Sequence, residues 1–266
     1  MRVTGNKKIN TYRLSIRVST DGFSLYIYKE GENKPFERQQ VAVSPGEQPH
    51  TALERALTRE RLMELQYDEV EMIVDAPTTR VPLEEFQREE TDTIFLLTFP
   101  RFKQAPVKIC YEILPYLEVV ELFAVDSQLL NMAVQLFPEL QLHSWQGRIL
   151  ESAAKNEQKQ SFAGQCLHVC RNASGIFVYV LKRRRLHFAC TYQADNPTDA
   201  LYYVLFAWKK LNLDANTDSC VLHGYDELAA HLGKYLKNLT LSPVRIPIPA
   251  NPKSAIVLPS NALIKF

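Results

Sequence analysis

The sequence lacks a long hydrophobic run, a strong charge of either sign and an even number of cysteines. Its longest apolar stretch, residues 200–208, is far shorter than the roughly 20 residues that span a bilayer, so we expect no membrane insertion. A net charge of +1 over 266 residues provides no field that would attract nucleic acid or an anionic membrane. Arg2, Lys7 and Lys8 precede no apolar segment, so we expect no secretory signal and a cytoplasmic location.

The five cysteines lie mostly in apolar, strand-like segments of a long chain. This pattern predicts reduced, buried thiols in a reducing compartment rather than a disulfide framework. Cys166, His168 and Cys170 alternate along a predicted strand, so all three could face one side, as a soft metal site requires. A fourth ligand at a matching spacing is missing, and we expect no metal.

One order of predicted elements occurs twice along the chain. The first copy has two strands around the turn Thr20-Asp21-Gly22, then a strand, a helix and a strand, at residues 14–19, 23–28, 40–43, 49–65 and 70–76. The second copy repeats this order and adds a helix, at residues 167–170, 176–181, 186–190, 196–211, 219–223 and 226–236. Aligning Gly22 with Gly175 places GFSLYIYK over GIFVYVLK, which predicts a duplicated α/β domain.

Residues 119–155, VVELFAVDSQLLNMAVQLFPELQLHSWQGRILESAAK, connect the two copies. They predict a strand, a helix that begins at Asp126-Ser127, a short strand and a final helix that begins near Trp-Gln-Gly. This order, followed by the second hairpin in CLHVCRNASGIFVYVLKRRRLHFACTYQADNPTDALYYVLFAWKKL, resembles the actin-like ATPase superfamily. The chain is most similar to a bacterial family of unknown function with that fold, and distantly similar to its pilus-assembly and secretion-platform proteins.

The resemblance implies an α/β protein with two duplicated ribonuclease-H-like domains, each a mixed five-stranded sheet flanked by helices. The first domain would comprise residues 1–160, with an inserted or returning segment at 91–160. The second would comprise residues 161–266 and end in a proline-rich extension. Five prolines in residues 242–266 favour an extended path for that extension.

The sequence departs from the superfamily at the positions that bind nucleotide. Active members carry Asp-x-Gly in each hairpin, where glycine admits a phosphate and aspartate organises hydrated magnesium. In this chain the first triplet falls on Arg17-Val18-Ser19, and the second on His168-Val169-Cys170 or Cys170-Arg171-Asn172. The Gly-Gly pair on the adenosine side corresponds to His223-Gly224-Tyr225, where a tyrosine would crowd a purine.

These departures predict a degenerate, non-catalytic ATPase that acts as a scaffold for a protein partner and has no resident cofactor. The alternative is a divergent ATP-binding protein with a rebuilt cleft, in which Asp21, Asp75 and main-chain amides would serve ATP and magnesium. The cleft candidates are Arg17, Ser19, Asp21, Gly22, Asp75, Gly175, His223 and Gly224. Simpler roles exist for the carboxylates: Asp21 in an ordinary Asp-Gly turn, Asp75 at a strand end and Asp126 as a helix cap.

A further alternative is an RNA-associated factor that uses the basic hairpin tip Lys182, Arg183, Arg184 and Arg185. Solvated hairpin tips often carry such charge and no RNA-binding signature accompanies it, so we expect no nucleic-acid partner. The sequence has no Gly-x-Ser-x-Gly, Walker or His-Glu-x-x-His motif. His143 and Ser144 are adjacent in a strand and point to opposite faces, which argues against a hydrolase triad.

Overall fold

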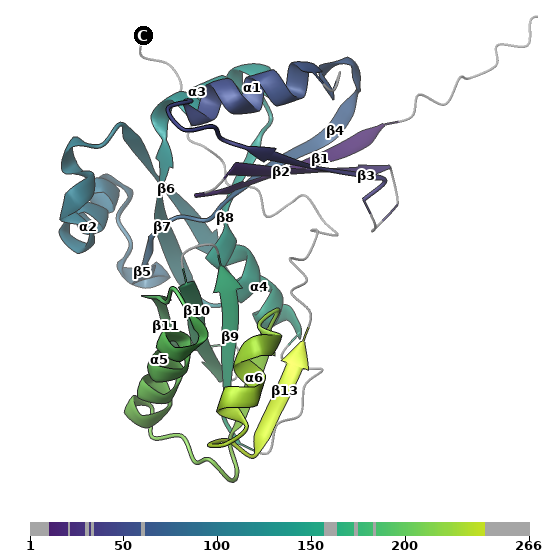
Figure 1. Cartoon of the computed structure of the whole chain (residues 1–266). Coiled ribbons are helices and arrows are strands. Elements are labelled where there is room, and N and C mark those ends of the chain that lie inside the picture. Colours follow the sequence, from purple (N-terminus) through teal and green to yellow (C-terminus); the bar gives the residue numbers. More distant parts are fainter. Residues whose placement is uncertain are drawn as a thin grey trace, which may run out of the picture.

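In the part of the chain that the structure describes, the strands form two large five-stranded sheets and a small three-stranded sheet (Figure 1). The structure, a computed structural model, describes residues 11–20, 22–29, 32, 35–59, 62–156, 164–172, 175–182 and 185–242. The first large sheet contains β1 (Tyr12–Ser19), β2 (Gly22–Lys29), β3 (Glu37–Ala42), β4 (Tyr67–Val74) and β8 (Gln141–Ser144). Their order is β3-β2-β1-β4-β8, in which β1 pairs antiparallel with β2 and parallel with β4.

The second large sheet repeats this arrangement. It contains β9 (Cys166–Asn172), β10 (Gly175–Lys182), β11 (Arg185–Gln193), β12 (Ser219–His223) and β13 (Asn238–Ser242). Their order is β11-β10-β9-β12-β13, in which β9 pairs antiparallel with β10 and parallel with β12. The two sheets thus share one strand order and the same strand directions, and each contains the hairpin that the sequence predicts.

Gly22 and Gly175 occupy equivalent positions at the start of the second strand of each sheet. Their φ angles are +144° and +152°, a region that residues with a side chain rarely adopt. A Cβ atom at either glycine would collide with a backbone carbonyl of the neighbouring third strand, at Val41 and Tyr192 respectively. These glycines therefore allow β2 and β10 to pack closely against β3 and β11.

The small sheet was not predicted from the sequence. It contains β5 (Thr78–Pro82), β7 (Val119–Asp126) and β6 (Val107–Leu114), in the order β5-β7-β6. The helix α2 (Thr91–Thr98) covers it through a cluster of buried side chains that includes Phe95, Val120 and Leu122. Short 3-10 turns occupy Leu62–Glu64, Leu83–Glu85, Arg88–Glu90 and Pro100–Gln104. Two strands of the small sheet, β6 and β7, lie within the expected segment 91–160, whereas β5 begins before that segment, at Thr78.

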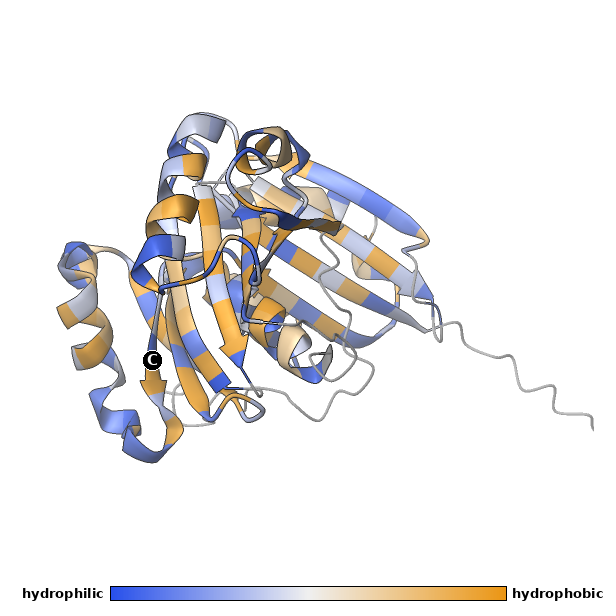
Figure 2. Ribbon diagram, turned by 90° about the horizontal axis from the view of Figure 1, so that it is seen from below, coloured by the Kyte–Doolittle hydropathy of each residue, from blue (hydrophilic) through white to orange (hydrophobic). Residues whose placement is uncertain are grey.

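Apart from α2, the helices pack on the two large sheets and form separate hydrophobic clusters with them. α1 (Pro49–Arg59) and α3 (Ser127–Leu136) pack on one face of the first large sheet. α5 (Pro197–Lys210) and α6 (Asp226–Leu232) pack on the second large sheet. α4 (Trp145–Asn156) lies between the two sheets and contributes Trp145, Ile149 and Leu150 to a cluster with Phe177 and Tyr179. Hydrophobic and hydrophilic residues alternate along many of the strands, as half-buried sheets require (Figure 2).

Most predicted elements are present, with shifted ends. The strand Ser219–His223 agrees at both ends, and the helix caps are confirmed: Asp126 accepts from the backbone N–H of Leu129 at 2.8 Å, and Asn196 caps α5. The helix expected at 49–65 ends at Arg59, and the helix expected at 226–236 ends at Leu232. This architecture confirms the predicted α/β fold with helices flanking mixed five-stranded sheets.

Within the described residues, no helix is long and apolar enough to cross a membrane. All five cysteines are free thiols; Cys190 is half-buried and the other four are buried. Among the described side chains, no group of three or more histidine, cysteine, aspartate or glutamate residues is arranged to hold a metal ion.

Candidate functional site

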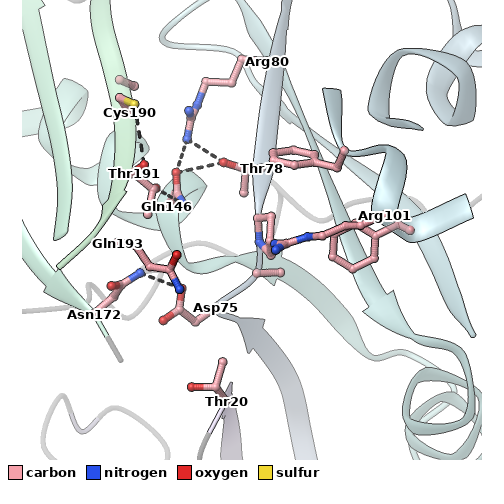
Figure 3. A pocket seen from close by; sticks show the side chains of 15 residues that line it. Thr20, Asp75, Thr78, Arg80, Arg101, Gln146, Asn172, Cys190, Thr191 and Gln193 are labelled. Atoms are coloured by element: carbon pink, nitrogen blue, oxygen red, sulfur yellow. Dashed lines mark hydrogen bonds between the residues drawn. The ribbon is translucent and has the colours of Figure 1, made fainter. Parts of the chain in front are cut away.

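A cleft of about 500 Å³ lies where the carboxyl ends of β1 and β4 meet the hairpin side of the second sheet. Thr20 and Asp75 line it from the first sheet, and Asn172, Thr191 and Gln193 line it from the second (Figure 3). Carboxyl ends of parallel strands are a frequent place for ligands in α/β proteins. This cleft is therefore the candidate site.

Asp75 joins the two sides of the cleft. Its backbone N–H donates to the carbonyl of Val18 at 2.9 Å, which fixes the chain as it leaves β4. Its carboxylate accepts a hydrogen bond from Asn172 Nδ2, at the end of β9, at 3.3 Å. The side chains that end two central strands thus bond to each other across the cleft.

Gln146, at the amino end of α4, makes the second connection. Its Nε2 donates to Thr191 Oγ1 on β11 at 2.9 Å. Its Oε1 accepts from Arg80 Nη2 at 2.7 Å and from Thr78 Oγ1 at 2.9 Å (Figure 3). Gln146 is therefore held between β5 on one side and the second sheet on the other.

Behind Arg80 lies a buried network of charged and polar groups. Arg80 Nη2 forms an ion pair with Glu121 Oε2 at 2.7 Å, and the Glu121 side chain is fully buried. Ser144 Oγ donates to the other carboxylate oxygen of Glu121 and accepts from the N–H of Gly147 at 2.7 Å, which caps α4. Burial raises the pKa of the Glu121 carboxyl, and the Arg80 guanidinium opposes that rise.

A second buried carboxylate supports the same turn. Glu112 Oε1 lies 2.7 Å from His143 Nδ1, and Glu112 Oε2 accepts from the backbone N–H of Ser144 at 3.1 Å. A Cβ atom at Gly147 would lie 2.8 Å from Glu112 Oε2, so a side chain at this position would displace the carboxylate. The network fixes where α4 begins, and hence where Gln146 points.

Arg101 is the exposed cation of the cleft, and its guanidinium lies 5.1 Å from the centre of the Phe102 ring. Asp75 is the one carboxylate among the described residues that line the cleft. The arrangement can therefore hold a small polar or anionic group, but it offers few oxygen ligands to a divalent cation.

Of the cleft residues that the sequence predicts in the first sheet, the structure places only some in the cleft. Asp75 lines the cleft, whereas Asp21 lies outside the described residues. Arg17 is not a described lining residue of the cleft, and its guanidinium lies 4.2 Å from the centre of the Tyr26 ring on the face of the first sheet. Ser19 ends β1, and its hydroxyl donates to the carbonyl of Gly22 at 3.2 Å.

The remaining candidates lie in the second sheet. Gly175 packs against β11, as described above. His223 Nε2 lies 3.1 Å from His168 Nδ1, so its ring faces another side chain of the same sheet. Gly224 has a φ of +64° and donates its N–H to the carbonyl of Ser242 at 3.0 Å, which connects β12 to β13.

Sequence reasoning missed most of the polar side chains that join the cleft, which include Arg80, Arg101, Gln146 and Thr191. Only Gln146 carried a signal, because it lies in the Trp-Gln-Gly motif of the resemblance. At the basic tip, Lys182 of β10 and Arg185 of β11 lie opposite each other in the hairpin and are exposed. Arg183 and Arg184 lie outside the described residues. A nucleic-acid role for this tip stays a prediction.

Comparison with known proteins identifies both a family and a fold. A family model described as "Protein of unknown function (DUF3822)" matches residues 4–239. A crystal structure from Bacteroides thetaiotaomicron, of a protein with an actin-like ATPase fold and unknown function, is 23% identical. The similarity covers 88% of this chain and 92% of that one with a TM-score of 0.77, which shows that this chain has the actin-like ATPase fold.

More distant structures are also similar. The PilM-PilN type IV pilus biogenesis complex is 13% identical, with coverage of 94% and 93% and a TM-score of 0.46. The Ppx/GppA phosphatase of Aquifex aeolicus is 11% identical, with coverage of 80% and 67% and a TM-score of 0.42. Because both TM-scores are below 0.5, neither bears on the function of this chain. No curated protein matches the sequence.

Proposed function

This chain belongs to the DUF3822 family, and we propose that it is a non-catalytic protein of actin-like fold that acts by binding a partner protein. In this function the two halves form a scaffold, and the cleft between them does not hydrolyse ATP. The observation that carries the proposal is the hydrogen bond between Asn172 and Asp75.

Two features of the cleft support the loss of hydrolysis. Magnesium in phosphate-transfer sites is held by one or two carboxylates together with substrate phosphates and water. Asp75 is the one carboxylate among the described lining residues, and it accepts a hydrogen bond from the opposite side of the cleft. Arg17, at the position of the first aspartate in active members of the actin-like superfamily, is instead stacked over Tyr26.

The cleft also favours a second candidate, a divergent nucleotide-binding protein. Its volume of about 500 Å³ is within the range of small-molecule sites. Arg101 is exposed at its wall and could pair with a phosphate. In this candidate the ligand would displace the hydrogen bond between Asp75 and Asn172.

Calorimetric titration with ATP, with and without Mg²⁺, tests the proposal. We expect no heat of binding and no thermal shift at millimolar ATP, and no release of phosphate. Saturable, magnesium-dependent binding that is lost in Asp75→Ala but kept in Asp92→Ala would contradict the proposal. Asp92 is a suitable control because it is exposed on α2 and is not a described lining residue of the cleft.

We further propose two domains, residues 1–160 and 161–266, in a cytoplasmic bacterial protein. The strands of the first large sheet end at Ser144 and those of the second begin at Cys166, which supports a boundary near residue 160. The free state of all five cysteines fits a reducing compartment.

A further inference from the structure

A second hollow, the amino-end groove, lies at the amino ends of β4 and β8. The cleft lies at the opposite, carboxyl end of β4. The groove has a volume of about 480 Å³. Its apolar lining comes from the segment before β4, from β4 itself and from the end of α3: Met63, Leu65, Tyr67, Val70, Leu136 and Phe137. The rings of Tyr67 and Phe137 pack edge to face with centroids 6.0 Å apart, and this pair forms the floor of the groove.

The groove borders an open strand edge. β1 pairs with β4 from Tyr67 onward, but β8 pairs with β4 only from Glu71 onward. In the described part of the chain, no strand pairs with the β8 side of residues 67–70. An exposed strand edge of this kind can be extended by a peptide segment that adds as a further strand.

The charge of the groove is of one sign. Asp68, Glu69 and Glu139 line it, and no arginine or lysine occurs among its described lining residues. Glu69 Oε1 is buried and has no hydrogen-bond partner in the described structure. Burial and the neighbouring Glu71 raise the pKa of Glu69, and Arg13 and Arg148 oppose that rise only in part. A further cation beside this carboxylate would stabilise its ionised form. The chain as a whole has a net charge of +1, so this acidic concentration is local.

We propose that the amino-end groove binds an extended segment of a partner protein in which apolar side chains alternate with lysine or arginine. The segment pairs with the open edge of residues 67–70 as an added strand. Successive side chains of a strand point to opposite faces, so its apolar and its cationic side chains meet different surroundings. Its apolar side chains contact the floor around Phe137, and its cations meet Asp68 and Glu139. This inference rests on the proposed function and gives it a place on the surface.

Fluorescence anisotropy with labelled synthetic peptides and the full chain tests the groove. The probe is a short peptide of alternating isoleucine and lysine. One comparison peptide has glutamate in place of lysine, and another carries N-methyl groups on all its backbone amides, which removes the N–H donors that strand pairing needs. We expect the first peptide to bind at least about tenfold more tightly than either comparison peptide. Its affinity falls as the salt concentration rises.

Paired variants locate the binding. The double variant Asp68→Asn, Glu139→Gln should lose at least about tenfold in affinity. The control Glu85→Gln, Glu89→Gln removes the same charge from exposed positions outside the groove and should keep the original affinity.

Several results would overturn the inference. Equal binding of the acidic or N-methylated peptide, or unchanged affinity in the groove variant, contradicts it. A tenfold gain in affinity on replacing Lys7 and Lys8 by glutamine would instead identify the chain's own basic segment as the occupant. ATP hydrolysis by the same preparation would refute the proposed function alone, so the two failures can be distinguished.

Discussion

His168 should make the stability of the protein sensitive to mildly acidic pH. The residue is 7% exposed, and its ring stacks on Tyr179 with centroids 4.7 Å apart. Burial, and to a lesser degree the neighbouring His223, lowers the pKa of His168 to about 3. The unfolded chain has a histidine pKa of about 6.5, so between these values the unfolded state binds a proton that the folded state does not. The free energy of unfolding therefore decreases as the pH falls through this window, by about 2 kcal/mol between pH 7 and pH 5.

Urea denaturation of the wild type and of His168→Phe at pH 7, 6 and 5 measures this effect. Phenylalanine keeps the ring stack on Tyr179 but binds no proton, so the variant should lose about 2 kcal/mol less than the wild type over this range. The control His231→Gln changes an exposed histidine at the end of α6 and should follow the wild type. Parallel pH profiles for the wild type and His168→Phe would refute the reasoning.

Three further predictions concern the framework of the cleft and of the sheets. Arg80→Ala should lower the free energy of unfolding by about 3–5 kcal/mol in urea denaturation, because it leaves the buried Glu121 carboxylate unpaired. Arg101→Ala, at an exposed position, should change it by less than about 0.5 kcal/mol. Gly175→Ala should destabilise by more than about 1 kcal/mol, measured in the same assay, because of its positive φ and the carbonyl behind it. Asp126→Ala should lower the thermal midpoint through the loss of about 1 kcal/mol of helix capping.

The repeated core could be predicted because local signals encode it. Turn glycines, alternating strands and capped helices mark the same elements in both halves, and Gly22 and Gly175 have the same role in the structure. The end of α1 could not be predicted, because the apolar spacing continues after the helix stops. Leu62 is buried in the same core as α1 although it lies in a 3-10 turn, so periodicity alone does not separate the two.

The cleft was less predictable because its polar residues come from separate elements. Arg80, Gln146 and Thr191 become neighbours only when β5 pairs with β7 and α4 packs against the second sheet. Glu121 was a signal that the sequence did offer, since it interrupts the apolar strand VVELFAV. A carboxylate in such a strand needs a buried partner, and Arg80 provides it.

The contacts that join the two halves are of two kinds, and their magnitudes differ. Each hydrogen bond across the cleft contributes about 0.5–1.5 kcal/mol net, because water replaces it when the cleft opens. Beside them, Trp145 of α4 packs edge to face on Phe177 of β10, with ring centroids 6.1 Å apart in a buried cluster. Burial of one large apolar side chain such as Phe177 contributes about 1.5–3 kcal/mol, so the apolar cluster holds the halves together while the hydrogen bonds select their alignment. We therefore expect that a partner bound at the proposed amino-end groove, at the other end of the strands of the first sheet, would leave this joint intact.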